Sequence, residues 1–253
     1  MAGTPLDEYG YAQLAGRVAA LAHLFRGEPL LDTPLWGRTA GPGTLAQVVK
    51  EASEWLKERD ARAEEVASTR VKGRIVQEVV LHLRQQGKDI SLPVALVADL
   101  VPGGISALRV YHSCWPLEGS HRVRPPLLEC SGHVDLPGAV GSYHQALREG
   151  DLKGMLSQFE ETGYAREPAG GEYVYRGVEG LRRFYGLLFS GGGIQLEHCT
   201  STDDGVRCAL EYNAVRWGQT ELHHQAGVAV YERGASGLLV AARIYDDVDP
   251  PLG

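Results

Sequence analysis

The sequence predicts an α+β fold made of two tandem copies of one unit, each with helices ahead of a long antiparallel sheet. Two observations support this prediction. Segments of the first half recur in the same order about 134 residues later, and each half shows helical patterns followed by strand patterns. The chain has 253 residues, which is enough for two domains of ordinary size.

The repeat is clearest where each half ends. Gly103, Arg109, Tyr111 and Pro116 stand 134 residues before Gly237, Arg243, Tyr245 and Pro250. The preceding strand patterns also correspond: 92–99 with 226–233, and 76–83 with 209–217, where Glu78 matches Glu211. A glycine opens a helical pattern in each half, at Gly43 and at Gly177. A collinear series of this kind indicates an internal duplication.

The second copy can be assigned element by element. A helix is expected from about Leu136, a second short helix follows the N-cap candidate Asp151, and a short strand covers 164–167. A further helix ends at the glycine run 191–193. Four strands follow, and the DDG turn at 203–205 favours a hairpin between the first two. These strands are expected over 194–201, 206–217, 222–232 and 238–248.

The first copy is less regular. We expect a helix over 11–25 and a loop over the proline-containing stretch 27–43. The charged run 51–70 is interpreted as the extension of a helix with a solvated face. The predicted domains are a first unit over 1–117, a linker over 118–135 and a second unit over 136–253.

Composition excludes several classes of function. The formal net charge is −7, and nucleic-acid binding requires a basic surface, so we expect no nucleic-acid partner. No signal peptide or membrane span is expected. The four cysteines lack metal-site spacing and are interpreted as reduced thiols of a cytoplasmic protein. His223 and His224 are adjacent strand residues that face opposite ways, so we expect no metal site and no cofactor.

The second copy resembles a known family. The segment SYHQALREGDLKGMLSQFEETGYAREP and the ending GLLVAARIYDDV are similar to the SnoaL-like branch of the nuclear transport factor 2 (NTF2) superfamily. The resemblance covers 135–248 well and 5–117 more weakly. It implies two cones, each a curved antiparallel sheet wrapped around helices. Because the family commonly dimerises sheet against sheet, it also implies an intramolecular pseudo-dimer.

The candidate site residues follow from strand alternation. Arg243, Tyr245 and Asp247 share one face of the last strand, with Ile244 and Asp246 on the other. Glu211, Asn213 and Trp217 share a face of 206–217. If both sets face the same side, they converge inside the cone below Tyr143 of the first helix. The expected catalytic residues are then Asp247, Glu211 and Arg243. The expected substrate-binding residues are Tyr143, Asn213, Tyr245 and Trp217.

Such a set suits cofactor-independent acid–base chemistry. A desolvated carboxylate removes a proton beside a carbonyl, and Arg243 holds that carboxylate or stabilises an oxyanion. The resemblance implies a cyclase or isomerase acting on a small, largely apolar metabolite such as a polyketide-like intermediate. Epoxide hydrolase or dehydratase chemistry is also open. The epoxide hydrolase pattern is incomplete, however, because 222–232 contains no aspartate and Tyr212 and Asn213 face opposite ways.

Two other interpretations stay open. The first is a non-catalytic module of the same fold that binds a small ligand or peptide, and the second is a protein-interaction scaffold with filled cones. Glu78 and Arg109 repeat Glu211 and Arg243, so this pair can equally be a cross-strand ion pair that stabilises each sheet. The two halves differ at Asp246 and Asp247, where the first half has His112 and Ser113.

Overall fold

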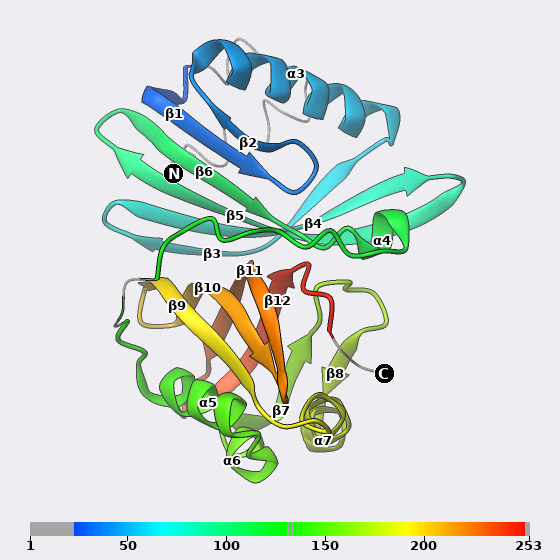
Figure 1. Cartoon of the computed structure of the whole chain (residues 1–253), viewed down its shortest axis with the longest axis vertical. Coiled ribbons are helices and arrows are strands. Elements are labelled where there is room, and N and C mark those ends of the chain that lie inside the picture. The colour runs from blue at the N-terminus through cyan, green and yellow to red at the C-terminus, as the bar shows by residue number, and fades with distance from the viewer. Residues whose placement is uncertain (1–22, 131, 133, 251–253) are drawn as a thin grey trace. The chain divides into compact units, whose positions relative to one another are not determined.

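The computed structural model describes residues 23–130, 132 and 134–250. The chain divides into two compact units, residues 1–112 and 113–253 (Figure 1). Within the described residues, no helix is both long enough and apolar enough to cross a membrane.

The first unit is built on one sheet, with strand order β2-β1-β6-β5-β4-β3. The pairing of β1 with β6 is parallel, and the other neighbours are antiparallel. Helix α3 (Pro42–Glu58) contacts β1 and β2 through its buried face, which includes Leu45, Val49 and Leu56. The strands are β1 (Phe25–Thr33), β2 (Gly37–Ala40), β3 (Arg62–Val71), β4 (Arg74–Gln85), β5 (Lys88–Val101) and β6 (Gly104–Tyr111).

The second unit has a sheet of the order β8-β7-β12-β11-β10-β9, in which β7 and β12 are parallel. Helices α5 (Gly138–Glu149), α6 (Leu152–Leu156) and α7 (Gly177–Leu188) pack on one face of this sheet (Figure 1). Their apolar side chains share a core with the sheet, centred on Tyr143, Tyr185 and Tyr231. The strands are β7 (Phe159–Arg166), β8 (Val174–Arg176), β9 (Ile194–Asp203), β10 (Arg207–Trp217), β11 (Thr220–Arg233) and β12 (Leu239–Asp246).

The two strand orders are the same when the strands are matched by position, so the predicted duplication is confirmed. The predicted α+β architecture is confirmed in both units as well. The strand pairing gives a more exact alignment of the two units. Arg109 lies opposite Val97 in the first unit, and Arg243 lies opposite Val230 in the second. The offset between β5 and β11 is therefore 133 rather than 134, and the extra residue falls in the longer loop between β11 and β12.

The predictions for the first unit were wrong in two places. The stretch 27–43 is not a loop but contains β1, β2 and the start of α3. The prolines of this stretch favoured the prediction of a loop. Pro29 is nevertheless compatible with a strand, because it lies at a register irregularity of β1, where no ladder N–H is required. The run 51–70 ends its helix at Glu58 and continues as β3, an edge strand whose charged side chains are exposed. The helix expected over 11–25 lies mostly outside the described residues, and Phe25 begins β1.

The segment between the two sheets packs as part of the second unit. It contains the short helix α4 (Trp115–Glu118), and the Arg124 carbonyl accepts a hydrogen bond from the Ala226 amide of β11. All four cysteines are free thiols, as expected. Cys199 and Cys208 are both buried.

Candidate functional site

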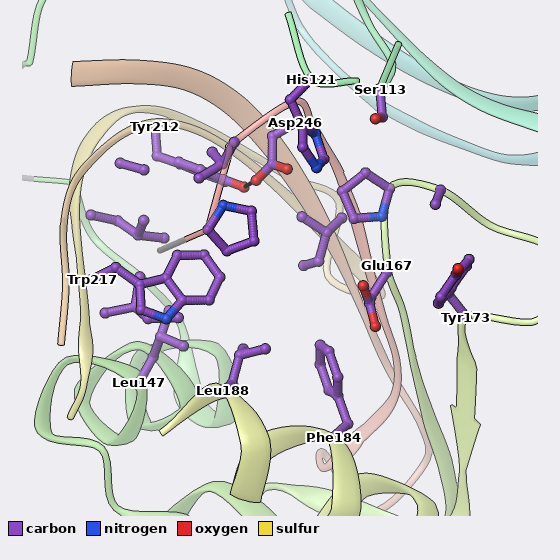
Figure 2. A pocket seen from close by; sticks show the side chains of 18 of the residues that line it. Ser113, His121, Leu147, Glu167, Tyr173, Phe184, Leu188, Tyr212, Trp217 and Asp246 are labelled. Carbon is purple, nitrogen blue, oxygen red and sulfur yellow. Dashed lines mark hydrogen bonds between the residues drawn. The ribbon is translucent and has the colours of Figure 1, made fainter. Parts of the chain in front are cut away.

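A cavity of about 290 Å³ lies inside the second unit, between its sheet and its helices (Figure 2). Its volume is close to the lower end of the range for small-molecule sites. Most of the lining is apolar, and polar groups are few. The apolar residues include Leu147, Phe184, Leu188, Ile194, Leu196, Ala214, Ile244 and Val248. The polar lining residues include Tyr212, Asp246, His121, Glu167 and Trp217.

Asp246 and Tyr212 form the central polar pair of this cavity. The Tyr212 hydroxyl donates a hydrogen bond of 2.6 Å to Asp246 Oδ2. Burial raises the pKa of Asp246 to about 6 from the ordinary 3.8, although the Tyr212 hydrogen bond acts in the opposite direction. Burial and the neighbouring Asp246 charge also raise the pKa of Tyr212 well above 10. Tyr212 therefore stays protonated, while Asp246 exchanges its proton close to neutral pH.

Gly227 makes this pairing sterically feasible. It lies on β11 directly between the two residues, opposite Tyr212 on one side and Asp246 on the other. A Cβ atom at this position would stand 2.7 Å from the Tyr212 ring and 2.8 Å from Asp246 Cβ. Only glycine leaves the space through which the two side chains meet across the intervening strand.

Trp217 offers the cavity a free hydrogen-bond donor. Its Nε1 atom is buried, and no described residue accepts a hydrogen bond from it. Trp217 faces the cavity because β10 has a register irregularity between Ala214 and Arg216. The irregularity shifts the alternation by one residue, so that Trp217 lies on the same face as Tyr212 and Ala214. A ligand oxygen could accept this N–H.

His121 is held at the edge of the cavity by Asp247. The two are joined by a 2.9 Å hydrogen bond from His121 Nδ1 to Asp247 Oδ1. Asp247 also accepts hydrogen bonds from Ser113 Oγ at 2.6 Å and from the amides of Cys114 and Arg122 at 2.9 and 2.7 Å. Burial alone would raise the pKa of Asp247, but these donors outweigh it and the pKa is lowered. Asp247 is thus an ionised anchor.

The hydrogen bond to Asp247 in turn raises the pKa of His121, against the effect of burial. The imidazole stacks on the Trp115 ring, with centroids 5.1 Å apart, and lies beside Asp246 in Figure 2. The arrangement fixes one ring nitrogen on a buried carboxylate. It places a group that readily carries positive charge beside the Asp246 carboxyl.

Glu167 is a second acid in the lining. It accepts a 2.6 Å hydrogen bond from the Tyr175 hydroxyl, and burial raises its pKa. The Tyr175 ring is stacked on Phe184 at 4.6 Å, which fixes the donor against the helix α7. Glu167 is therefore a candidate for contact with a polar end of a ligand.

The structure brings only part of the predicted site together. Tyr143 and Trp217 line the cavity, as expected, and the Tyr143 hydroxyl accepts a 3.0 Å hydrogen bond from Tyr185. The expectation that the other five residues converge in the cone was wrong. Asp247, Glu211, Arg243, Asn213 and Tyr245 are all absent from the lining.

The physical reason is the choice of sheet face. The cavity side carries Tyr212 and Ala214 of β10 and Ile244 and Asp246 of β12, which alternate with the predicted residues. On the other side, Glu211 accepts a hydrogen bond from Thr200 at 2.8 Å. Asn213 and Tyr245 have local contacts on that side as well. Asn213 donates a hydrogen bond to the Leu128 carbonyl, and the guanidinium of Arg166 lies over the ring of Tyr245.

The repeated arginine has a structural role in both units. Arg243 pairs with Glu232 at 3.0 Å, and Arg207 approaches the same carboxylate at 3.2 Å. In the first unit the equivalent carboxylate, Asp99, is held at 2.6 Å by both Arg74 and Arg109. Each unit thus has one carboxylate between two arginines on three adjacent strands.

Sequence reasoning missed Asp246, Tyr212, His121 and Glu167 as cavity residues. One available signal was Gly227 in the middle of the predicted strand 222–232, because such a glycine marks close approach of neighbouring groups. Among residues 23–130, 132 and 134–250, no group of three or more metal-binding side chains is found.

Comparisons with known proteins give matches at the level of structure. No family model matches the chain, and no curated protein matches it. An NTF2-like protein of unknown function from Cytophaga hutchinsonii matches with 16% identity and a TM-score of 0.35, over 46% of this chain and 96% of its own. A putative polyketide cyclase from Xanthomonas campestris matches with 17% identity and a TM-score of 0.38, over 46% and 94%.

A protein from Catenulispora acidiphila with a ketosteroid isomerase-like fold, crystallised with trimethylamine, matches with 13% identity and a TM-score of 0.40. The match covers 47% of this chain and 92% of that protein. Each of these structures therefore corresponds to about half of the chain. The Cytophaga hutchinsonii protein is the one of these three that is named NTF2-like.

Proposed function

We propose that the second unit is a cofactor-independent acid–base enzyme that acts on a small, largely apolar substrate with a carbonyl group, as a cyclase or isomerase does. The observation that supports this most is Asp246, a carboxyl with a pKa of about 6 at the polar end of an apolar cavity. A general base with a pKa near the working pH is well matched to proton abstraction.

In this proposal the Asp246 carboxylate takes a proton from the carbon beside the substrate carbonyl. The electron pair of the broken C–H bond moves to the carbonyl oxygen as an enolate forms. In an isomerisation, Asp246 then returns the proton to another carbon. In a cyclisation, the enolate carbon attacks a second carbonyl carbon, and Asp246 returns the proton to the alkoxide that forms. Either course needs no redox partner, because no electrons leave the substrate.

Donors for the developing oxyanion are present in the same cavity. Trp217 has an N–H without a partner among the described residues, and the raised pKa of His121 favours its positively charged form. Preorganised donors of this kind stabilise an enolate more than a neutral carbonyl. Asp247 acts as a positioning residue, since it orients His121 and does not reach the cavity. Tyr143 and the apolar lining would bind the body of the substrate.

The direct experiment is deuterium exchange at carbon. A panel of small cyclic ketones and enones is incubated with the full chain in heavy water, and incorporation beside the carbonyl is followed by proton NMR. We expect exchange with wild type and loss of most of it in Asp246→Asn. Glu211→Gln is the control, because Glu211 is a buried acid on the other side of the sheet and is absent from the cavity lining. Exchange that survives Asp246→Asn, or falls equally in both variants, would contradict the proposal.

The second candidate function is binding without catalysis. The observation that favours it is the 2.6 Å hydrogen bond by which Tyr212 already occupies one oxygen of Asp246. A carboxyl engaged in this way can serve to orient a ligand. If ketones protect the second unit from hydrogen exchange but show no deuterium incorporation, binding becomes the better description.

A further inference from the structure

A second cavity, of about 200 Å³, lies on the other side of helix α5. The helix separates the two: Tyr143 and Leu147 line the first cavity, whereas His144 and Arg148 line the second. Ile194 and Leu196 of β9 line both cavities and form part of the wall between them. The complete lining of the second cavity is Val134, Leu136, Gly141, His144, Gln145, Arg148, Ile194, Leu196 and His198.

His144 is the unusual group in this lining. Only 7% of the residue is exposed, and its Nε2 atom is buried without a hydrogen-bond partner among the residues that the structure describes. The ring of His198 stands 4.7 Å away and nearly perpendicular. A buried polar atom without a partner is costly, so it calls for an explanation such as an absent ligand.

The charges of this cavity favour an anion. Arg148 supplies a permanent positive charge, and none of the described residues in the lining is an acid. A metal cation would meet the guanidinium, so the two imidazoles are poorly placed to bind one. Imidazole N–H groups and a guanidinium are, in contrast, the usual donors to a carboxylate.

We propose that the second cavity is a binding site for a small organic carboxylate. Its oxygens accept hydrogen bonds from the Arg148 guanidinium and from imidazole N–H groups of His144 and His198. Its apolar part contacts Leu136, Ile194 and Leu196. The volume limits the ligand to one smaller than a drug-sized molecule. The site is distinct from the Asp246 cavity and does not depend on the function proposed for it.

A bound anion would also change how the two histidines titrate. Burial lowers the pKa of His144 well below its ordinary value, and burial together with the Arg148 charge lowers that of His198. The titratable and charged groups around His144 are His198, Arg148, Tyr143 and Tyr231. A carboxylate beside these groups offsets the charge of Arg148 and raises both histidine pKa values. Binding therefore takes up protons and should tighten as the pH falls.

The test is an NMR titration of the histidine ring signals of the full chain with isobutyrate, and with isobutyramide as the uncharged isostere. We expect saturable shifts of His144 and His198 with isobutyrate alone, and tighter binding at pH 6 than at pH 8. Arg148→Gln should weaken binding by about tenfold or more, since a charged hydrogen bond is lost.

Two controls keep the outcome clear. Arg148 is exposed on α5, so its replacement should leave the fold intact, and Arg182→Gln on α7 removes an exposed helical arginine elsewhere. Arg182→Gln and Asp246→Asn should both bind isobutyrate as wild type does. The proposal is overturned if isobutyramide gives the same shifts, if no saturable shift appears, or if Arg148→Gln binds as tightly as Arg182→Gln.

Discussion

Replacing Asp246 by asparagine should stabilise the second unit relative to wild type, by an amount that grows as the pH rises from about 4 to about 6 and is constant above that. In the folded protein, burial raises the pKa of Asp246 to about 6, whereas the ordinary value of 3.8 applies to the unfolded chain. As the pH rises from about 4, the unfolded chain loses this proton first. The free energy of unfolding of wild type therefore falls between these two values and is flat above the folded pKa. Asparagine cannot ionise, so the variant lacks this loss.

The magnitude follows from the difference between the two pKa values. That difference is about 2 pH units, and each unit corresponds to ~1.4 kcal/mol, which gives an upper limit of about 3 kcal/mol. Asparagine can still accept the Tyr212 hydrogen bond, although a neutral acceptor binds it less strongly. We therefore expect Asp246→Asn to exceed wild type by roughly 1–3 kcal/mol at pH 8 and to match it near pH 4.

The assay must report on the second unit alone, because the chain has two units. Urea unfolding read by hydrogen exchange of peptides from β10 to β12 meets this need. Unfolding curves at pH 4, 6 and 8 give the difference between the proteins at each pH. The reasoning would be refuted if the difference in free energy of unfolding did not change with pH. It would also be refuted if wild type became more stable relative to the variant between pH 4 and pH 6.

The remaining predictions concern buried groups in the sheets of the two units. Asp247→Asn should lower the free energy of unfolding by about 2–4 kcal/mol at pH 7, because four donors lose a charged acceptor. The loss should shrink in acid, since the lowered pKa of Asp247 stabilises the fold only above the ordinary value of 3.8. Urea unfolding of wild type and Asp247→Asn at pH 3 and pH 7 measures the loss of stability at each pH. An equal loss at pH 3 and pH 7 would contradict this prediction. Gly227→Ala should push Tyr212 away from Asp246, destabilise the unit by about 1–3 kcal/mol and raise the pKa of Asp246 further. Carboxyl NMR titration checks this, and an unchanged Asp246 titration would show that the contact is not tight. Arg243→Gln and Arg109→Gln should each destabilise their own unit by about 1–3 kcal/mol, because each carboxylate keeps one arginine of two. Neither variant should alter the Asp246 titration, and a change there would link Arg243 to the cavity.

The duplication and the strands of the second unit could be predicted because the signals are redundant. Arg109 and Arg243 recur at a fixed spacing, and the glycine run 191–193 and the DDG turn 203–205 end elements locally. In the first unit, the prolines around β1 favoured a loop and the charges of β3 favoured a helix, so neither strand was predicted. Both strands are stabilised by pairing with sequence-distant neighbours, which local propensity does not report.

The sheet face that lines the cavity could not be predicted from the sequence. On both faces of β10 and β12, polar side chains stand among small or β-branched ones. Alternation separates Asp246 from Asp247 correctly but does not say which one faces the helices. The irregularity near Ala214 also moved Trp217 to the opposite set. The anchoring of Asp247 by Ser113 and His121 depends on a segment more than 120 residues away in the sequence.

The most direct test of the proposed site is the titration of the two neighbouring aspartates. Carbon-13 labelled aspartate in the full chain resolves the carboxyl signals, and Asp246→Asn and Asp247→Asn assign them. The structure predicts one signal that titrates near pH 6 and disappears in Asp246→Asn, and one that titrates below 3.8 and disappears in Asp247→Asn. If Asp247 has the higher pKa, or if both titrate near 4, the cavity does not hold a raised carboxyl. The proposed base would then be wrong.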